Sequence, residues 1–380
     1  MQLYNPESII ENDNRKKVLI GLLGDVGFGG GLNAFLYNML SHMDCSKFCI
    51  HIYAPGRVVS AKMADAYKEL GAVIYTGGWE QETRKAVWQD LEYLTGLYHY
   101  DAIHSNCGKV WFHYFACYFG IKNHIPKRIV HSHNALLPRI KPEVQKQDDI
   151  YRKFILENAT DFLACSEKAA KWLFGSGFQD YTVLKNGIDL EKYRFDREIR
   201  DKYRKELGIE NKFVIGHAGR FGKQKNHAFL IDIFKEITKY NEDSVLLMAG
   251  GGTLFEDIKC KTKKFGMENK CMFLGVREDM PGLLQAMDVF VLPSLFEGFP
   301  VSLVEARASG LPCITSDEIT EEVCLLKEVE RIPLKDDAKH WAEKILKFKD
   351  FKRESVTHDL ELSGYDAQNS ANYLLQLYSK

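Results

Sequence analysis

The stretch from Met287 to Pro312 constrains the fold more than any other part of the chain. It begins with MDVFVLPS, an apolar run that stops after a proline, and this pattern predicts a buried strand leading into a loop. A short helix is expected from about Val301 to Ser309, with Gly310 as its C-cap. Buried strands of this kind are typical of parallel sheets covered by helices. The sequence therefore predicts an α/β protein.

The same stretch has the features of an anion site. A strand, a glycine-containing loop and a helix N-terminus direct backbone N–H groups and a positive dipole towards one point, where phosphate is the usual ligand. Glu297 lies in the loop, and Glu305 lies about one turn inside the helix. Carboxylates at these two places can accept hydrogen bonds from sugar or ribose hydroxyls beside a bound diphosphate. The alternative is that both are ordinary surface charges.

Length and composition set the broad class. A chain of 380 residues is long enough for two domains, and 45% hydrophobic and 27% charged residues are ordinary for a globular protein. The formal net charge of −1 argues against a general nucleic-acid binder. Nine cysteines without a CxxC pair indicate reduced thiols. With no signal-peptide pattern and no apolar run near the ~18 residues that cross a bilayer, a cytoplasmic location is expected.

Strand and helix patterns alternate in two series, joined by a linker at YTVLKNGID (Tyr181–Asp189). Two such series indicate two doubly wound domains. In the first series, the aromatic helix Lys109–Gly120 is expected to be mostly buried. Pro138–Gln147 is polar and is expected to form a mobile loop before a helix at Asp149–Asn158. A last helix is expected at about Ala367–Tyr378.

A glycine-rich turn, DVGFGGGLNAF, follows the first predicted strand. It lacks the spacing of a Walker phosphate loop. The second predicted strand, Phe48–Tyr53, also lacks the acidic residue that a nicotinamide dinucleotide requires. A glycine-rich turn alone is a weak signal, because tight turns need glycine without any ligand.

A second specific stretch, GRFGKQKN (Gly219–Asn226), follows the first strand of the second series. Open α/β sheets bind ligands at the carboxyl ends of their strands. Arg220 offers a planar fork and Lys225 a point charge, a suitable pair for a diphosphate. The alternative is a solvated basic turn. The position after a strand favours the binding interpretation.

Histidines and acidic pairs bear on catalysis and metal binding. His104, His131 and His217 lie within predicted strands, where buried core residues are the favoured interpretation. His133 ends its strand. No two aspartates are separated by one residue, so the D-x-D pair of metal-dependent transferases is missing. No metal cofactor is expected, because cationic groups can stabilise the phosphate charge instead.

The glycine loop, HSHN, NGID, GRFGKQKN and the two-glutamate stretch together resemble the signature of retaining glycosyltransferases of the large family four. The resemblance covers nearly the whole chain. It implies the GT-B fold, with two facing Rossmann-like domains: an acceptor-side domain at residues 1–185 and a nucleotide-sugar domain at residues 186–364. A C-terminal helix, residues 365–380, is implied to pack back on the first domain.

The resemblance also implies roles for individual residues. The positions implied to be catalytic are Arg220, Lys225, Glu297 and His133. Those implied to bind the sugar donor are Gly30, Gly31, Gly219, Gly250, Val276, Arg277, Gly298, Phe299, Pro300, Val301 and Glu305. In the family the base, here expected to be uracil, lies against backbone groups at the segment containing Val276 and Arg277.

The implied function is transfer of a sugar from a nucleotide diphosphate sugar to a glycan or lipid-linked acceptor. HSHN and ACSEKAAKWLFG look most like bacterial members that build capsular or exopolysaccharide units. Two alternatives remain open: a nucleotide-sugar 2-epimerase, and a non-catalytic sugar-nucleotide or glycan-binding protein. Lys109–Lys153 carries nine Lys/Arg against three Asp/Glu, which suggests peripheral contact with the inner membrane.

Overall fold

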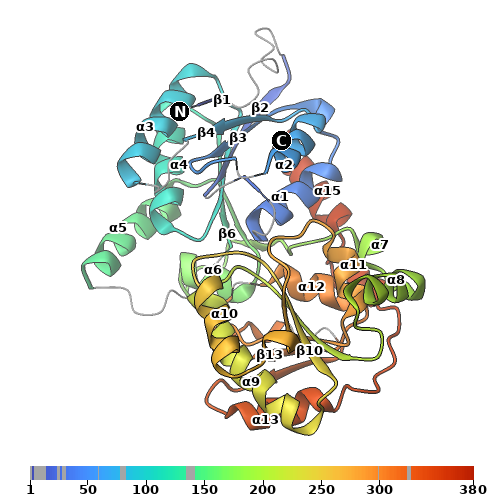
Figure 1. The fold of residues 1–380 in the computed structure, drawn as a ribbon. Coiled ribbons are helices and arrows are strands. Elements are labelled where there is room, and N and C mark those ends of the chain that lie inside the picture. The colour runs from blue at the N-terminus through green and yellow to red at the C-terminus, as the bar shows by residue number, and fades with distance from the viewer. Residues whose placement is uncertain are drawn as a thin grey trace. The chain divides into compact units, whose positions relative to one another are not determined.

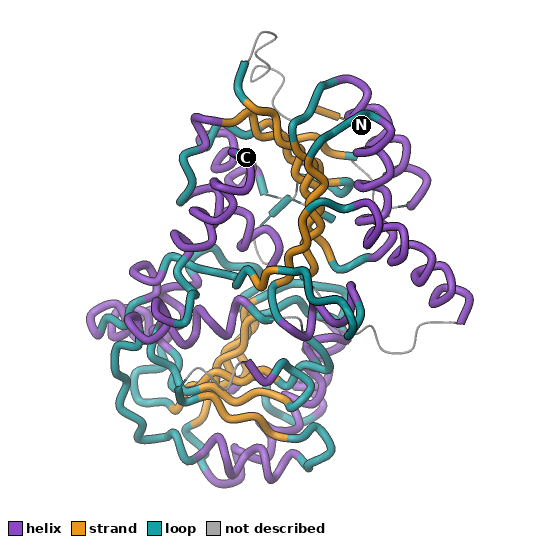
Figure 2. The backbone as a smooth tube through the Cα atoms, turned by 180° about the vertical axis from the view of Figure 1, so that it is seen from behind, coloured by secondary structure: helices purple, strands orange, loops and turns teal. Residues whose placement is uncertain are grey.

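Every apolar run that the sequence offers as a strand lies in one of two sheets. The computed structural model describes residues 2–3, 14–23, 26–27, 31–58, 60–77, 83–133, 142–297, 299–322 and 327–380. These residues form two units (Figure 1 and Figure 2). The first holds most of the chain up to Asn186 together with Ala367–Lys380. The second holds Gly187–Asp366 and, from the amino-terminal part of the chain, Gly31.

The sheet of the first unit runs in the order β1-β4-β3-β2-β5-β6-β7-β8, and its pairs are parallel except at the β1 edge. The order changes direction at β2, which lies between β3 and β5. A doubly wound sheet binds ligands at such a point. The strands are β1 (Gln2–Leu3), β2 (Lys16–Leu22), β3 (Phe48–Ala54), β4 (Val73–Thr76), β5 (Ala102–Cys107), β6 (Lys127–Ser132), β7 (Asp161–Ala164) and β8 (Thr182–Val183).

Helices cover both faces of this sheet, because its strands are apolar on both sides. Val18 and Ile20 of β2 pack towards α1 (Gly31–Ser41), α2 (Ala61–Glu69) and α15 (Ala367–Ser379). Leu19 packs towards α3 (Arg84–Leu97) and α4 (Val110–Lys122) on the opposite face. The alternation follows the two-residue period of a strand. The C-terminal helix α15 is thus part of the first unit, as the fold prediction required.

Helix α4 is the aromatic helix of the sequence, and the prediction that it is mostly buried is confirmed. Phe112 and Phe119 are fully buried, and Trp111 and Phe115 are nearly so. The helix packs against α3 and the following helix α5 (Pro142–Asn158). An apolar helix surface on all sides requires this degree of burial.

The prediction of a loop at Pro138–Gln147 is wrong from Pro142 onwards. Helix α5 begins at Pro142 and continues through Gln147 to Asn158. Proline at the first helical position and Glu143 in the first turn both favour a helix start. Residues 142–147 are polar because this part of the helix is exposed on all sides, and a polar composition is also typical of loops. Residues 138–141 lie outside the described residues.

The sheet of the second unit runs in the order β11-β10-β9-β12-β13-β14 and is parallel throughout. This order changes direction between β9 and β12, so a ligand site is expected at their carboxyl ends. The strands are β9 (Phe213–Ala218), β10 (Ser244–Ala249), β11 (Cys271–Phe273), β12 (Val289–Leu292), β13 (Cys313–Ser316) and β14 (Val329–Ile332).

Three helices bury their apolar faces in the main core of this second sheet: α9 (His227–Tyr240), α10 (Phe255–Lys264) and α13 (Ala338–Leu346). The remaining elements of the unit are α7 (Leu190–Tyr193), α8 (Arg197–Leu207), α11 (Met280–Ala286), α12 (Val301–Ala308), α14 (Thr357–Leu362) and the short 3₁₀ turns η3 (Lys223–Lys225) and η4 (Glu268–Lys270). Among the elements of this unit, α7, α8, α13, α14 and β14 were not predicted from the sequence.

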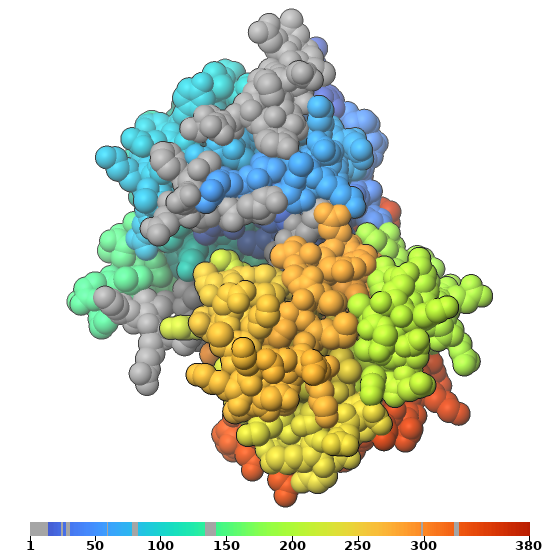
Figure 3. Space-filling view, in the orientation of Figure 1, coloured from blue at the N-terminus to red at the C-terminus, as the bar shows by residue number. Residues whose placement is uncertain are grey.

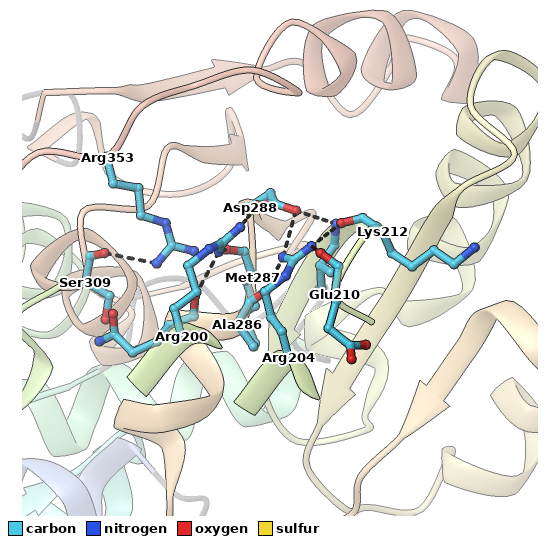
Figure 4. A network of polar contacts seen from close by, with 11 residues as sticks. Arg200, Arg204, Glu210, Lys212, Ala286, Met287, Asp288, Ser309 and Arg353 are labelled. Atoms are coloured by element: carbon cyan, nitrogen blue, oxygen red, sulfur yellow. Dashed lines mark hydrogen bonds and ion pairs between the residues drawn. The ribbon is translucent and has the colours of Figure 1, made fainter. Parts of the chain in front are cut away.

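Helix α8 is rich in charge and lies at the surface of the second unit, in the light-green segment of Figure 3. Polar contacts attach it to the amino end of β12 (Figure 4). Asp288 accepts hydrogen bonds from Arg200 (2.6 Å) and Arg204 (3.2 Å), and also from the Val214 amide (2.7 Å). Arg204 donates further to the backbone carbonyls of Ala286, Glu210 and Lys212. We call Arg200, Arg204, Asp288 and Arg353 the amino-edge network.

Candidate functional site

Four loops meet at the carboxyl ends of β9, β10, β11 and β12, and we call their described residues in the second unit the carboxyl-edge site. The loop after β9 contains the GRFGKQKN motif and the loop after β12 contains Glu297. Since β9 and β12 are neighbours at the point where strand order changes direction, these two loops lie side by side. The predicted residues of this site are Gly219, Arg220, Lys225, Gly250, Val276, Arg277, Glu297, Phe299, Pro300, Val301 and Glu305.

Glycine is required where the loops after β9 and β10 touch through their backbones. Gly250 has φ +142°, and a Cβ placed there would lie 2.1 Å from the carbonyl oxygen of Gly219. Gly252, with φ +148°, would place its Cβ 2.5 Å from the carbonyl oxygen of Phe221. L-residues rarely adopt these angles. The two loops are joined by the hydrogen bond from the Phe221 amide to the Gly251 carbonyl (2.8 Å).

Lys225 and Glu297 form an ion pair between neighbouring loops, with Nζ and Oε1 2.7 Å apart. Both side chains are largely covered, 15% and 9% exposed. The aliphatic part of Lys225 lies over Gly219, where a Cβ would come within 2.8 Å of Cε. The sequence analysis gave Lys225 to the diphosphate and Glu297 to the sugar, but the structure brings the two side chains into contact with each other.

Gln224 is a residue of this site that the sequence analysis missed. Its side-chain amide donates to Oε2 of Glu297 (3.1 Å) and to the carbonyl of Phe296 (3.0 Å). The backbone carbonyl of Gln224 accepts a hydrogen bond from the Leu295 amide (2.8 Å). Gln224 therefore ties the turn η3 to the loop after β12 and fixes the Glu297 carboxylate. Its position next to Lys225 in the motif was the signal that could have identified it.

Arg220 differs from Lys225 in having no side-chain partner among the described residues. Its side chain is exposed, and it forms no hydrogen bond or ion pair with any residue in the described part of the chain. A guanidinium in this state retains five N–H donors in a planar fork. It is therefore suited to an anionic ligand rather than to holding the fold.

The N-terminus of α12 supplies backbone donors to the same edge. Pro300 is the N-cap residue, and no side chain of the described residues caps this end of the helix. Helix N-termini present unpaired N–H groups and a partial positive charge. Val301 and Phe299 are buried, and the Phe299 ring packs on Tyr365 at 5.1 Å between centroids. Their side chains thus help to hold the loop that leads into α12. Gly298 lies outside the described residues.

Glu305 lies further along α12 and accepts a hydrogen bond at Oε1 from the hydroxyl of Tyr193 (2.8 Å). Burial raises the pKa of Glu305, while the hydrogen bond from Tyr193 and the charges of Lys192 and Lys225 lower that pKa. Tyr193 was missed by the sequence analysis. It follows the NGID motif by four residues, but nothing local identifies Glu305 as its partner.

The loop after β11 holds Val276 and Arg277. Val276 is 54% exposed and lies close to Gly251. Arg277 donates twice to Asp279, at 2.7 and 2.6 Å, and Asp279 also accepts from Tyr203 at 3.0 Å. Since the guanidinium of Arg277 is hydrogen-bonded to Asp279, the expected contact with the base would be made by the backbone and by the exposed Val276 side chain.

In the first unit, His133 follows β6 and lies 3.2 Å from the Asn106 side chain at the end of β5. Its ring also contacts His131 and Phe35. Burial, followed by the charges of other histidines, lowers the pKa of His133 well below its usual value, so the imidazole is neutral. Gly31 is the first residue of α1, and a Cβ there would meet nothing within 4 Å. Gly30 lies outside the described residues.

Three histidines that lie within predicted strands are core residues, as expected from the sequence. His104, His131 and His217 are fully buried or nearly so. His104 contacts the Tyr378 hydroxyl, and His217 contacts the Val291 carbonyl. Within the described ranges, no three His, Cys, Asp or Glu side chains lie close enough together to hold a metal ion. None of the described helices is both long and apolar enough to span a bilayer.

Comparison with known proteins places this geometry in a family. One family model, described as glycosyl transferases group 1, matches residues 199–356, and another, described as glycosyltransferase family 4, matches residues 29–192. The putative glycosyltransferase EpsF of Bacillus subtilis is 38% identical over 264 residues, which cover 67% of this chain and 69% of EpsF. A UDP-Gal:alpha-D-GlcNAc-diphosphoundecaprenol alpha-1,3-galactosyltransferase of Escherichia coli is 40% identical over 150 residues, which cover 38% of each protein.

Solved structures show the same architecture. The structure of Anabaena HepE with UDP and glucose superposes with a TM-score of 0.76 at 16% identity, covering 96% of this chain and 100% of that one. WaaG, a glycosyltransferase involved in lipopolysaccharide biosynthesis, gives a TM-score of 0.69 at 14% identity, covering 95% and 96%. These similarities confirm the GT-B fold. Together with the two family models and the identity to EpsF, they show that this chain belongs to glycosyltransferase family 4.

Proposed function

We propose that this glycosyltransferase moves a sugar from a UDP-sugar to a glycan or lipid-linked acceptor in the synthesis of a bacterial surface polysaccharide, such as an exopolysaccharide or capsule. One observation carries the proposal. Arg220, Lys225 and the uncapped N-terminus of α12 all lie at the carboxyl edge of one sheet, beside two carboxylates. Cations and amides suit a diphosphate, and carboxylates suit the hydroxyls of its sugar and ribose.

The choice of nucleotide and acceptor rests on similar proteins. HepE was solved with UDP and with UDP-glucose, and it shares the fold. The Escherichia coli relative is named for UDP-Gal and for a diphosphoundecaprenol acceptor, which is a lipid-linked sugar. Both names support a UDP-sugar for this chain, and the name of the Escherichia coli relative supports a lipid-linked acceptor.

The proposed reaction breaks the bond between the anomeric carbon and the phosphate oxygen and forms a bond from the same carbon to the acceptor oxygen. As the first bond loosens, negative charge grows on the diphosphate, and Arg220, Lys225 and the amides of the α12 N-terminus stabilise that charge. The acceptor hydroxyl attacks from the same face, so the α configuration is retained. Its proton passes to the departing phosphate oxygen, and no protein nucleophile takes part.

The other implied residues orient the sugar in this scheme. Glu297, fixed by Gln224 and Lys225, accepts hydrogen bonds from sugar hydroxyls. His133, neutral and held at the end of β6, donates or accepts a single hydrogen bond near the reacting carbon.

We propose that the reaction needs no metal cofactor. In support, the carboxyl-edge site offers two side-chain cations and a helix N-terminus to the diphosphate, and the sequence lacks a D-x-D pair. Transfer is expected to continue in excess chelator. A loss of turnover that a divalent cation restores would contradict this part of the proposal.

The experiment that tests the function combines binding with product analysis. A panel of nucleotide sugars is screened by thermal shift, where a bound sugar donor at ~100 times its Kd stabilises the protein by about 2.7 kcal/mol. Stabilisation by UDP-sugars, followed by sugar transfer to a lipid-linked acceptor, supports the proposal. Epimerised sugar formed without acceptor would instead identify an epimerase. Binding without any turnover, and without even slow hydrolysis of the sugar donor, would identify a binding protein.

We further propose a cytoplasmic location with peripheral contact at the inner membrane. Helix α5 supports this idea, since Ile150 is 64% and Val144 37% exposed beside the exposed Lys146 and Lys153. Other basic groups of this region have partners inside the unit: Lys122 pairs with Glu92, and Arg128 donates to the carbonyls of Ile125, Pro126 and Asn158. Flotation with anionic but not neutral vesicles is expected. Equal binding to both, or to neither, contradicts it.

A further inference from the structure

The hydrogen bond between Tyr193 and Glu305 joins two segments of the second unit that lie 112 residues apart in the chain. Tyr193 is buried, 9% exposed, whereas Glu305 is partly exposed at the carboxyl-edge site. Within the described part of the chain, the carboxylate of Glu305 accepts no other hydrogen bond. Tyr193 therefore occupies Oε1 and leaves Oε2 with its full capacity to accept from a ligand.

The backbone at Tyr193 is anchored to a neighbouring helix of the second unit. The buried side chain of Gln285, on α11, donates to the carbonyls of Tyr193 (3.2 Å) and Arg194 (3.3 Å). The same side chain accepts from the Asp196 amide (3.2 Å). Helix α7 is thus attached to α11 on one side and, through the hydroxyl, to α12 on the other. The hydroxyl is a fixed donor to the Glu305 carboxylate.

The charged state of Glu305 depends on this donor. Burial raises the pKa of Glu305 and favours the neutral acid, whereas Tyr193, Lys192 and Lys225 lower that pKa and favour the carboxylate. Burial and the charge of Glu305 raise the pKa of Tyr193 well above its usual value, so the phenol keeps its proton and donates it. A neutral Glu305 loses an acceptor for ligand hydroxyls.

We infer that Tyr193 is a positioning residue for the nucleotide: its hydroxyl fixes one oxygen of the Glu305 carboxylate so that the other receives the neighbouring hydroxyls of a ribose. The inference rests on the proposed function, because it requires a nucleotide at the carboxyl-edge site. The inference predicts that the protein prefers ribose to 2′-deoxyribose. This preference should depend on the Tyr193 hydroxyl, although that hydroxyl contacts neither sugar.

The test measures binding of UDP and of 2′-deoxy-UDP by calorimetry from pH 4.5 to 8 for the wild type and Tyr193→Phe. The variant keeps the ring and removes only the donor. UDP is expected to bind about 10-fold more weakly, as for loss of a hydrogen bond to a charged group. 2′-Deoxy-UDP should be affected less. Since the pKa of Glu305 rises without the donor, the loss of UDP binding at low pH should begin at a higher pH in the variant.

Tyr181→Phe is the matched control, because Tyr181 also donates to a glutamate, Glu167 (2.5 Å), but in the first unit. It should change neither affinity nor pH profile. A purely structural role for Tyr193 would weaken both nucleotides equally and leave the pH profile in place, and either this result or unchanged UDP binding overturns the inference. If the wild type binds none of UDP, GDP and ADP, the proposed function itself fails, and the inference fails with it.

Discussion

The two ends of the sheet in the second unit use cationic side chains in opposite ways. At the amino end, Arg200 and Arg204 share the carboxylate of Asp288 and donate to backbone carbonyls (Figure 4). At the carboxyl end, Arg220 has no partner among the described residues. Lys225 is intermediate between the two kinds of cation, because its largely covered side chain has one anionic partner, Glu297.

The difference shows how position on a doubly wound sheet separates stability from function. A buried charge must be paired and hydrogen-bonded, because desolvation is costly. Arg200 and Arg204 meet that requirement through Asp288 and attach α8 to the sheet. An exposed cation contributes little to stability, so it can be kept for a ligand whose charge grows during the reaction. Mutations at the two ends should therefore separate stability from activity.

The largest effect is expected for Asp288→Ala, which removes the carboxylate shared by Arg200 and Arg204. Two largely buried guanidinium groups lose their counter-charge, and the free energy of unfolding should fall by about 3–5 kcal/mol. Denaturant unfolding followed by circular dichroism measures the change. Asp243→Ala is the control, since Asp243 pairs with Lys212 at an exposed position and its loss should leave the midpoint unchanged. Equal effects of the two substitutions would contradict a structural role for the network.

The next largest effect is expected at the opposite end. Arg220→Ala should lower kcat by ~10²–10³-fold, the loss typical of one group that stabilises transition-state charge, and should leave the melting temperature unchanged. Lys225→Ala should lower kcat similarly but also cost some stability, because Glu297 then loses its cationic partner. Steady-state kinetics with melting curves give both quantities. If either variant changes only KM, that cation merely binds the sugar donor.

A smaller effect is expected for Glu305→Gln. If Glu305 holds the ribose equally in the ground and transition states, its change should raise KM for the sugar donor about 10-fold with little change in kcat. Initial rates over a range of UDP-sugar concentrations at saturating acceptor measure the two parameters. A fall in kcat as large as that of Arg220→Ala would instead place Glu305 among the groups that act on the growing charge.

The smallest effect is expected within the amino-edge network itself. Arg353 lies over the Phe195 ring and donates to the Ser309 carbonyl at 3.4 Å, but it forms no ion pair with the described residues. Burial lowers the pKa of Arg353 to about 9. Arg353→Met keeps the packing and removes an unpaired charge, so stability should be unchanged or rise by about 1 kcal/mol.

The pH dependence of this last change provides its check. The unfolded chain holds the Arg353 proton more tightly than the folded one, so the charge destabilises the fold below pH 9 and less as the pH rises through that value. Any advantage of Arg353→Met should therefore shrink towards pH 10 in denaturant unfolding. An advantage that grows with pH would be inconsistent with a buried, unpaired guanidinium.

The sequence by itself determined the architecture and indicated a candidate site at the carboxyl edge of the second sheet. Continuous apolar runs identify most strands, because a parallel sheet covered by helices buries both faces of each strand, and an apolar period of 3.6 residues identifies many of the helices. The motifs after β9 and β12 were recognisable because loops at the carboxyl ends of parallel strands share one edge. Exposed helical turns were harder: Pro142–Gln147 and the charged α8 have compositions that resemble loops.

Only the tertiary structure decided which side chains meet. Strand order places β9 beside β12, and this adjacency brings Lys225 to Glu297 and Gln224 to the same carboxylate. The contact of Tyr193 with Glu305 depends on how α7 packs against α12, across 112 residues of chain. Residue spacing carries no information about such pairs, because each partner satisfies its own local pattern equally well without the other. Packing of distant segments selects the partners, and with them the charge and orientation of each group.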